Sequence, residues 1–441
     1  MFSRAIESKA IETLAVRVII LAFGLCTSII LTRYLGPSGR GELATILLWP
    51  AVFVYLTCSG FIESIVYFGA QREGESREIL WFTSFTALSL SLVITFLAYL
   101  SLPAILSEKM TDYVGISRYY LITMPMLITT EFNSALLLSR MHFRAVNLLL
   151  VLTPVGYLVG VIGLVWGDRL DVRSLVMLLI VLSAVRFVGG FALLRRHRLL
   201  VKPRRDLALC GAMLRYAGTA HAGSAFHISN GYLDQALIAS WLDPKSYGLY
   251  VTAASTARLP LVLSQAVVTL ISPRLAQPGQ AQERAAQLAT VFRRYWLGSG
   301  AAMLLFLVVM TPGIPFLYGS AFDGSVHVAQ VLLLGTLVLG AKDVLAAGVR
   351  ALGKPRASSK AELVGILLTL PLLLVTLPML GIMGAAITSV ISYGASLAII
   401  QIYIMRTYGV RAIALFLPVR DKGNESEASS RPFPNNREGT A

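Results

Sequence analysis

The stretch Thr32-Arg-Tyr-Leu-Gly-Pro-Ser-Gly-Arg-Gly-Glu42 is a short polar interruption between two long apolar runs, and it recurs later as Ser240-Trp-Leu-Asp-Pro-Lys-Ser-Tyr-Gly-Leu-Tyr250. Pro37 matches Pro244 and Gly41 matches Gly248, both at an offset of 207 residues. Because proline cannot continue a helix and glycine frees the backbone beyond it, each stretch is expected to link two helices. The recurrence predicts that the chain contains two copies of one unit.

The chain is too apolar for a soluble protein of its length. Its 441 residues are 56% hydrophobic and 14% charged, with a mean hydropathy of +0.71. Runs of about 20 apolar residues are long enough to cross a membrane as helices. Twelve such spans are predicted, and we expect the first to be retained rather than cleaved as a signal peptide. They lie at residues 11–32, 43–69, 79–106, 114–139, 145–166, 172–194, 217–241, 247–273, 296–318, 327–349, 361–379 and 382–405.

The distribution of Lys and Arg predicts the orientation of the chain. With both termini in the cytoplasm, 26 of the 38 basic residues fall in inside segments, 7 in outside loops and 5 in spans or at their ends. This bias follows the positive-inside rule, and it accounts for the net charge of +15 without a nucleic-acid partner. The three cysteines have no metal-ligand spacing, and no cofactor is predicted.

A second recurring loop supports two halves, because Arg140-Met-His-Phe-Arg-Ala145 corresponds to Leu352-Gly-Lys-Pro-Arg-Ala357. An even number of spans in each half predicts an all-α polytopic membrane protein of two parallel six-helix repeats around a central cavity. The basic segment that connects the two halves is expected either to contact lipid headgroups or simply to set the topology as a cytoplasmic loop. The predicted parts are an N-terminal half (1–195), a basic cytoplasmic connector with an amphipathic lead-in (196–216), a C-terminal half (217–405) and a disordered cytoplasmic tail (406–441).

Charged and polar residues within the spans are the candidate site residues, because a charge at a helix centre costs about 2.5–3.5 kcal/mol on insertion scales. Arg17 lies on a polar stripe of span one, and Arg258 lies in span eight two residues before Pro260. The predicted substrate-binding residues are Arg17, Arg186, Asn230 and Arg258.

A second group is predicted to serve ion coupling or to form internal ion pairs. Asp234 in span seven is the best candidate for coupling to an ion or proton. The structural alternative is that Arg17 pairs with Glu63 and Arg258 pairs with Asp234. The group consists of Glu63, Glu131, Asp234, Lys342 and Asp343.

The motifs argue against an enzyme. Gly36-Pro-Ser-Gly-Arg-Gly41 lacks the Lys-Ser/Thr of a nucleotide-binding phosphate loop and joins two spans on the outer face. The predicted outer loops are all too short to hold the acceptor site of a lipid-sugar transferase or polymerase.

Four motifs carry a family resemblance: Leu35-Gly-Pro-Ser-Gly-Arg-Gly-Glu42, Leu242-Asp-Pro-Lys-Ser-Tyr-Gly-Leu-Tyr250, Leu352-Gly-Lys-Pro-Arg356 and Gly381-Ile-Met-Gly-Ala-Ala386. The chain resembles the bacterial polysaccharide-export flippases, the oligosaccharide flippase branch of the superfamily that includes multidrug exporters of the MATE type and lipid II flippases. The resemblance covers nearly the whole chain.

The resemblance implies a flippase of the bacterial cytoplasmic (inner) membrane that moves an undecaprenyl-diphosphate-linked oligosaccharide from the inner to the outer leaflet, for export of O-antigen, capsule or exopolysaccharide. Membrane lipids, a polysaccharide polymerase and glycosyltransferases are the implied partners. Lipid II flippases have arginines on their first and eighth spans, which implies that Arg17 and Arg258 hold the diphosphate. The alternatives are a drug or cation exporter of the same superfamily and a non-transporting membrane partner of a polysaccharide-synthesis complex.

Overall fold

The computed structural model describes residues 2–106, 113–275, 280–410 and 416; the side chains of residues 2–14, 73, 222–230, 270, 272–274 and 281 lie outside the description. All regular elements in these ranges are helices, which confirms the predicted all-α class. They are α1 (Phe2–Gln71), η1 (Glu73–Glu75), α2 (Ser76–Ile105), α3 (Val114–Tyr120), α4 (Thr123–Ser139), α5 (Phe143–Trp166), α6 (Val172–Arg196), α7 (Leu207–Trp241), α8 (Pro244–Ala257), α9 (Leu261–Leu275), α10 (Ala281–Tyr318), η3 (Ser320–Phe322), α11 (Gly324–Ala351) and α12 (Pro355–Tyr408).

Aspartate side chains fix where several of these helices begin. Asp171 accepts a hydrogen bond from the backbone N–H of Ser174 ahead of α6, and Asp243 accepts one from Ser246 ahead of α8. Asp206 accepts two, from the first turn of α7. Each carboxylate satisfies backbone donors that have no partner within the helix, and it thereby fixes the residue at which that helix begins.

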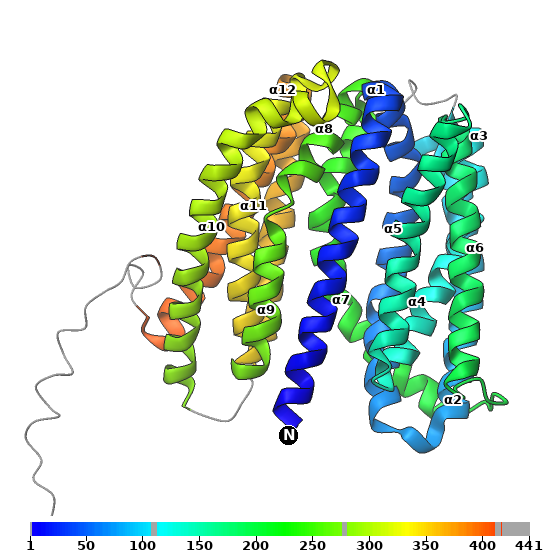
Figure 1. Ribbon diagram of the computed structural model, residues 1–441. Coiled ribbons are helices and arrows are strands. Elements are labelled where there is room, and N and C mark those ends of the chain that lie inside the picture. Colours follow the sequence, from blue (N-terminus) through cyan, green and yellow to red (C-terminus); the bar gives the residue numbers. More distant parts are fainter. Residues whose placement is uncertain (1, 107–112, 276–279, 411–415, 417–441) are drawn as a thin grey trace, which may run out of the picture.

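The two longest helices each contain a glycine kink. α1 has 70 residues and breaks at Gly36 (φ 65°), and α12 has 54 residues and breaks at Gly381 (φ 56°). A helix rises 1.5 Å per residue, so either one is long enough to cross a bilayer core of about 30 Å twice. Both breaks coincide with links predicted between spans, and Figure 1 shows α1 turning back on itself at the end away from the N-terminus.

The described helices make this a multi-pass membrane protein. Eight of them are long and apolar enough to span a membrane, or nine if α8 and α9, which are bent by 45° at their junction, form one span. Two crossings each for α1 and α12 and one for α7 would give twelve, and this number remains a prediction.

Two bundles of helices stand side by side in Figure 1, α2–α6 in one and α9–α12 in the other, with α1 and α7 running between them. The lead-in predicted at 207–216 is continuous with α7. Its Leu209 and Met213 pack into the apolar core of the first bundle, whereas Ile238 and Ala239 near the other end of α7 pack into a core of the second. The helix α7 therefore belongs to both bundles. The tail beyond residue 416 lies outside the described residues.

The two recurring turns contact each other. A Cβ atom built on Gly41 would lie 1.7 Å from the carbonyl oxygen of Pro244, and one built on Gly248 would lie 1.9 Å from the carbonyl oxygen of Pro37. The contact is reciprocal, because the glycine of each copy packs on the proline of the other. We call this contact the glycine crossing. It joins α1 to α8 at the end of the molecule away from the N-terminus, which is the outer end in the predicted orientation.

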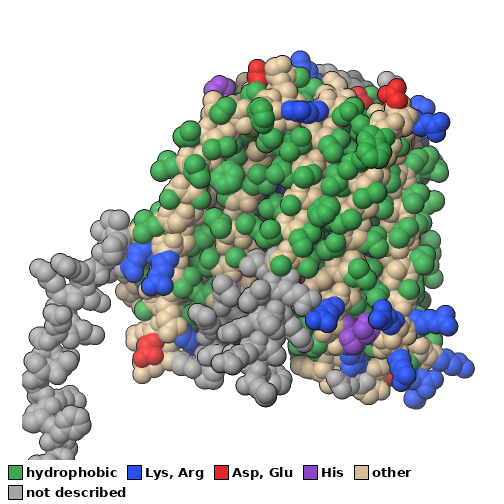
Figure 2. All heavy atoms as spheres, in the orientation of Figure 1, with side chains coloured by type: hydrophobic (Ala, Val, Ile, Leu, Met, Phe, Trp, Pro, Cys, Tyr) green, Lys and Arg blue, Asp and Glu red, His purple; other side chains and the backbone are tan. Residues whose placement is uncertain are grey.

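Surface charge differs between the two ends of the molecule. On the face drawn in Figure 2, hydrophobic side chains cover the middle of the molecule, and most of the Lys and Arg side chains gather at the end where the chain begins. Apolar surface of this extent is stable only against lipid.

Candidate functional site

Arg17 connects α1 to α9. Its side chain is exposed, and Nη1 donates a hydrogen bond to Oε1 of Gln265 at 3.1 Å. Arg17 lies on the first part of α1 and Gln265 lies on α9, so the contact joins the predicted first and eighth spans. The partner is a neutral amide rather than Glu63, and the guanidinium keeps its charge uncompensated by this bond.

Arg258 lies at the break between α8 and α9. It follows the last residue of α8, and Nη2 donates a hydrogen bond of 3.4 Å to the carbonyl oxygen of Gly231 on α7. Pro260 follows two residues later, and because proline interrupts the backbone hydrogen-bond ladder it accounts for the 45° bend here. The bend holds a partly buried guanidinium against α7.

Asp234 is buried on α7, with 3% of its surface exposed. One carboxylate oxygen accepts a short hydrogen bond from the Tyr250 hydroxyl, and the other accepts one from the backbone N–H of Gln235 at 2.7 Å. Arg258 and Tyr393 interact with it electrostatically, but within the described residues Asp234 and Arg258 form no ion pair. The alternative predicted from the sequence, an ion pair between Asp234 and Arg258, is therefore not what the described residues show. Asp234 accepts a hydrogen bond from Tyr250 instead.

Two of the predicted site residues form an ion pair with each other. Nη2 of Arg186 on α6 lies 3.0 Å from Oε1 of Glu131 on α4, with side-chain exposures of 13% and 29%. Both helices belong to the first bundle, and in this pair the negative charge of Glu131 compensates the positive charge of Arg186.

Lys342 is held in a buried ion pair in the second bundle. Its Nζ lies 2.7 Å from Oε1 of Glu362 on α12 and 3.4 Å from Oδ1 of Asp343. Only 1% of the Lys342 side chain is exposed. Sequence reasoning missed Glu362, because it lies at the edge of the predicted span 361–379, where it reads as a span end.

Glu63 and Asn230 complete the predicted set. Glu63 is exposed on α1 near Tyr216 of α7, where the Tyr67 and Tyr216 rings stack with centroids 4.6 Å apart. Asn230 lies on α7, and its side chain is outside the described residues. The predicted site residues are therefore gathered in several places rather than one.

Two further arginines, Arg33 and Arg40, lie in the first recurring turn. Arg33 donates hydrogen bonds from Nε and Nη2 to the carbonyl oxygens of Leu317 and Phe316, at 2.7 and 2.5 Å, at the end of α10. Nε of Arg40 is buried and has no hydrogen-bond partner among the described residues. Their position within the recurring stretch from Thr32 to Glu42 is the sequence signal that could have singled them out.

Comparison with known proteins gives a family. Residues 8–278 match the family described as "Polysaccharide biosynthesis protein". A probable low-salt glycan biosynthesis flippase from Haloferax volcanii is 24% identical over 189 residues, which are 41% of this chain and 39% of the relative. The matched segment thus spans about two fifths of the length of that curated relative.

Solved structures of similar fold cover most of the chain. An inward-facing MATE family transporter of the MOP superfamily has a TM-score of 0.73 and 10% identity, covering 90% of this chain and 98% of its own. The lipid II flippase MurJ in an inward closed conformation has a TM-score of 0.74 and 14% identity, covering 91% and 88%. With the matched segment extending over more than half of its length, this chain belongs to the polysaccharide biosynthesis protein family and has the fold of MOP-superfamily transporters.

Proposed function

We propose that the protein is a flippase for a lipid-linked glycan, and more narrowly that it moves an undecaprenyl-diphosphate-linked oligosaccharide from the inner to the outer leaflet of a bacterial cytoplasmic membrane. The family match, the name of the Haloferax relative and the fold shared with a lipid II flippase support this proposal. The exported product would be a surface polysaccharide such as O-antigen, capsule or exopolysaccharide. A polymerase and glycosyltransferases are its proposed partners.

The observation that carries the proposal is the pairing of Arg17 with a neutral group across the two repeats. Arg17 meets Gln265, seven residues beyond Arg258 on the same broken span, and among the described residues the hydrogen-bond acceptors of both arginines are uncharged oxygens. A diphosphate is a dense anion, and guanidinium groups bind it through bidentate, charge-assisted hydrogen bonds. These two cations would hold the diphosphate, with the sugars between the halves and the lipid tail in the bilayer.

The transport step would be a rocking of one half against the other. The glycine crossing closes the outer end on this view, and separating α1 from α8 there would release the head group outward. Asp234 is the proposed coupling residue, because protonation or cation binding at this carboxylate would compete with its hydrogen bond from Tyr250, which joins α7 to α8.

The test uses purified protein in liposomes that contain a fluorescent undecaprenyl-diphosphate-linked oligosaccharide. The rate at which the glycan becomes accessible to a membrane-impermeant reagent measures flipping. Arg17→Gln and Arg258→Gln should each slow it about tenfold or more, because each removes a charge-assisted hydrogen bond. Arg169→Gln, on an exposed arginine of the loop between α5 and α6, is the matched control and should keep the wild-type rate.

Liposomes also separate transport from a purely structural role. A non-transporting partner of a synthesis complex would leave the glycan in its original leaflet. Wild-type flipping by both arginine variants would instead overturn the assignment of the diphosphate site.

A further inference from the structure

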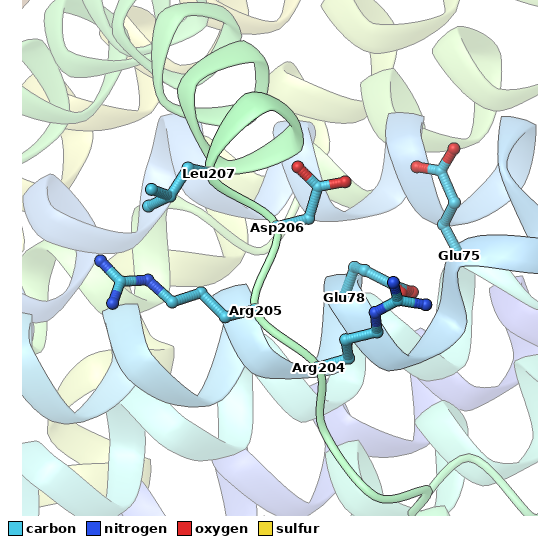
Figure 3. A pocket seen from close by; sticks show the side chains of 6 residues that line it. All are labelled: Glu75, Glu78, Arg204, Arg205, Asp206 and Leu207. Carbon is cyan, nitrogen blue, oxygen red and sulfur yellow. The ribbon is translucent and has the colours of Figure 1, made fainter.

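A pocket of about 590 Å³ opens where the connector meets α2, at the end of the molecule opposite the glycine crossing. It is lined by three carboxylates, two guanidinium groups and one leucine (Figure 3): Glu75, Glu78, Arg204, Arg205, Asp206 and Leu207. None of these residues takes part in the proposed transport site, so the pocket calls for a separate explanation.

The pocket lies at the start of α2, just before a stripe of exposed apolar side chains on the same helix. Phe85, Leu88, Leu92 and Phe96 recur at helical spacing on α2 and are 54%, 61%, 61% and 62% exposed. The stripe continues toward the helix start through Trp81, which stacks on Phe85 with ring centroids 4.9 Å apart. Tryptophan is typical of the level where acyl chains give way to headgroups. Glu78, one turn earlier on the same face, therefore lies at headgroup depth.

The connector is fixed against this face rather than loose. Arg77 donates a hydrogen bond from Nε to the carbonyl oxygen of Lys202 at 2.9 Å, and the backbone N–H of Arg204 donates one to the carbonyl oxygen of Arg77 at 3.1 Å. The Arg205 guanidinium lies over the Trp81 ring, with its carbon 5.7 Å from the centroid. Both basic residues of the pocket are thus held beside the acidic start of α2.

The internal contacts use these charges only in part. Nη1 of Arg72 donates to both carboxylate oxygens of Glu75 at 3.0 Å, on side chains that are 45% and 39% exposed. The contact between Nε of Arg204 and Oε1 of Glu78 is long, at 3.7 Å, and the Arg204 side chain is 71% exposed. Asp206 uses Oδ1 to begin α7. In Figure 3 the carboxylates of Glu75 and Asp206 both border the open space, while Arg204 lies next to Glu78.

The mixture of charges selects the ligand. A phosphate alone would meet three carboxylates, and an amine alone would meet a guanidinium group, so each would face repulsion as well as attraction. A group with a phosphate and an ammonium a few ångströms apart satisfies both sets. The N–H donors of an ammonium suit carboxylate acceptors, whereas a trimethylammonium has none.

We propose that this pocket binds the phosphoethanolamine headgroup of a lipid in the adjacent leaflet. The phosphate lies against Arg204, the ammonium donates to Glu75 and Asp206, and the acyl chains run along the exposed stripe of α2. Arg205 points to the other side of the connector in Figure 3, over Trp81. Such a lipid bridges α2 and the connector, the segment that joins the two halves.

Lipid retention by delipidated, detergent-solubilised protein tests this proposal. Phosphatidylethanolamine, phosphatidylcholine and phosphatidylglycerol are added at equal mole fraction, and native mass spectrometry counts the lipids that stay bound. The ethanolamine lipid should be retained about tenfold better than either competitor, since each competitor loses one charge-assisted set of contacts. Equal retention of the three, or preference for the anionic lipid, overturns the proposal.

Two variants and a control localise the effect. Glu75→Gln and Arg204→Gln change side chains that are 39% and 71% exposed, and each should remove most of the preference. Arg406→Gln, on an exposed arginine in the last turn of α12, should leave it unchanged. An unchanged preference in both pocket variants rejects this site. Soluble phosphoethanolamine is added alone as a further arm, and binding as tight as that of the lipid would reject the role of the acyl chains.

Discussion

Charged side chains in the spans divide into two kinds according to their partners. Lys342 and Arg186 each lie within hydrogen-bond distance of a carboxylate in their own bundle. Arg17 and Arg258 are bonded to an amide oxygen and a backbone carbonyl oxygen instead. Neither of these acceptors carries a negative charge, although Asp234 interacts electrostatically with Arg258, so the second kind is the one suited to a mobile anion.

The Lys342 pair should be structural. Lys342→Met removes the ammonium group that faces the buried carboxylate of Glu362, and breaking such a pair costs about 3–5 kcal/mol. Thermal unfolding in detergent should show this loss. The double variant Lys342→Met/Glu362→Leu removes both charges and should recover most of the stability while flipping continues. Loss of flipping in a stable double variant would assign these residues a functional role.

A pair of histidines should make stability depend on pH. The rings of His142 and His197 stack with centroids 4.0 Å apart in the loops at the ends of α4 and α6. Burial, and then the nearby His197 and Arg140, lower the pKa of His142 below its ordinary value of 6.5. Protonation therefore favours the unfolded chain, so this contribution is fully present above about pH 6.5 and is lost as the pH falls below it.

Thermal unfolding between pH 8 and pH 5 measures the effect. The wild-type protein should lose stability toward pH 5 more steeply than His142→Gln, which cannot titrate at this position. Identical slopes for the two proteins would show that the histidine pair does not contribute.

The sequence alone could not predict which carboxylate each charged side chain in the spans would pair with. Arg186 and Glu131 are 55 positions apart, and Lys342 and Glu362 are 20 apart. Which carboxylate a buried cation meets depends on how far each helix is rotated about its axis, and hydrophobic pattern fixes this only to a broad face. Sequence composition could identify which spans carry charge but not the partners.

At the scale of elements, the glycine crossing holds α1 against α8. Gly41→Leu and Gly248→Leu should each destabilise the protein by about 1–3 kcal/mol, because a side chain would overlap the backbone of the other repeat. Thermal unfolding measures the loss. Gly163→Leu is the matched control, since a Cβ atom on this helical glycine of α5 meets nothing within 4 Å.

The double variant provides a sharper result. One separation of the two helices makes room for both side chains, so Gly41→Leu/Gly248→Leu should cost less than the two single variants together. Strict additivity would mean that the two contacts are independent of each other.

The recurring turns show what local chemistry can predict. The Leu-x-Pro pattern followed by glycine indicated a break in the helix, and the break occurs at Gly36. The link before the last predicted span likewise breaks at Gly381. The contact between the two turns was not predictable in the same way, because a repeat in sequence does not say how the two copies dock.

For the whole molecule, the predicted orientation can be tested by labelling single cysteines introduced into a variant without the three native cysteines. Arg169→Cys lies in an exposed loop at the predicted outside, and Arg198→Cys lies in the connector at the predicted inside. A membrane-impermeant maleimide should label position 169 in intact cells and position 198 only after permeabilisation. The reverse pattern would invert the topology and, with it, the direction proposed for transport.

The reciprocal form of the glycine crossing has the symmetry of a contact between two copies of one protein. In a homodimer with two-fold symmetry, a residue of one subunit contacts a second residue of its partner, and the same two residues meet again with the roles exchanged. Gly41 with Pro244 and Gly248 with Pro37 repeat this arrangement inside one polypeptide. The contact thus has the symmetry of an isologous interface, although both of its sides belong to one chain.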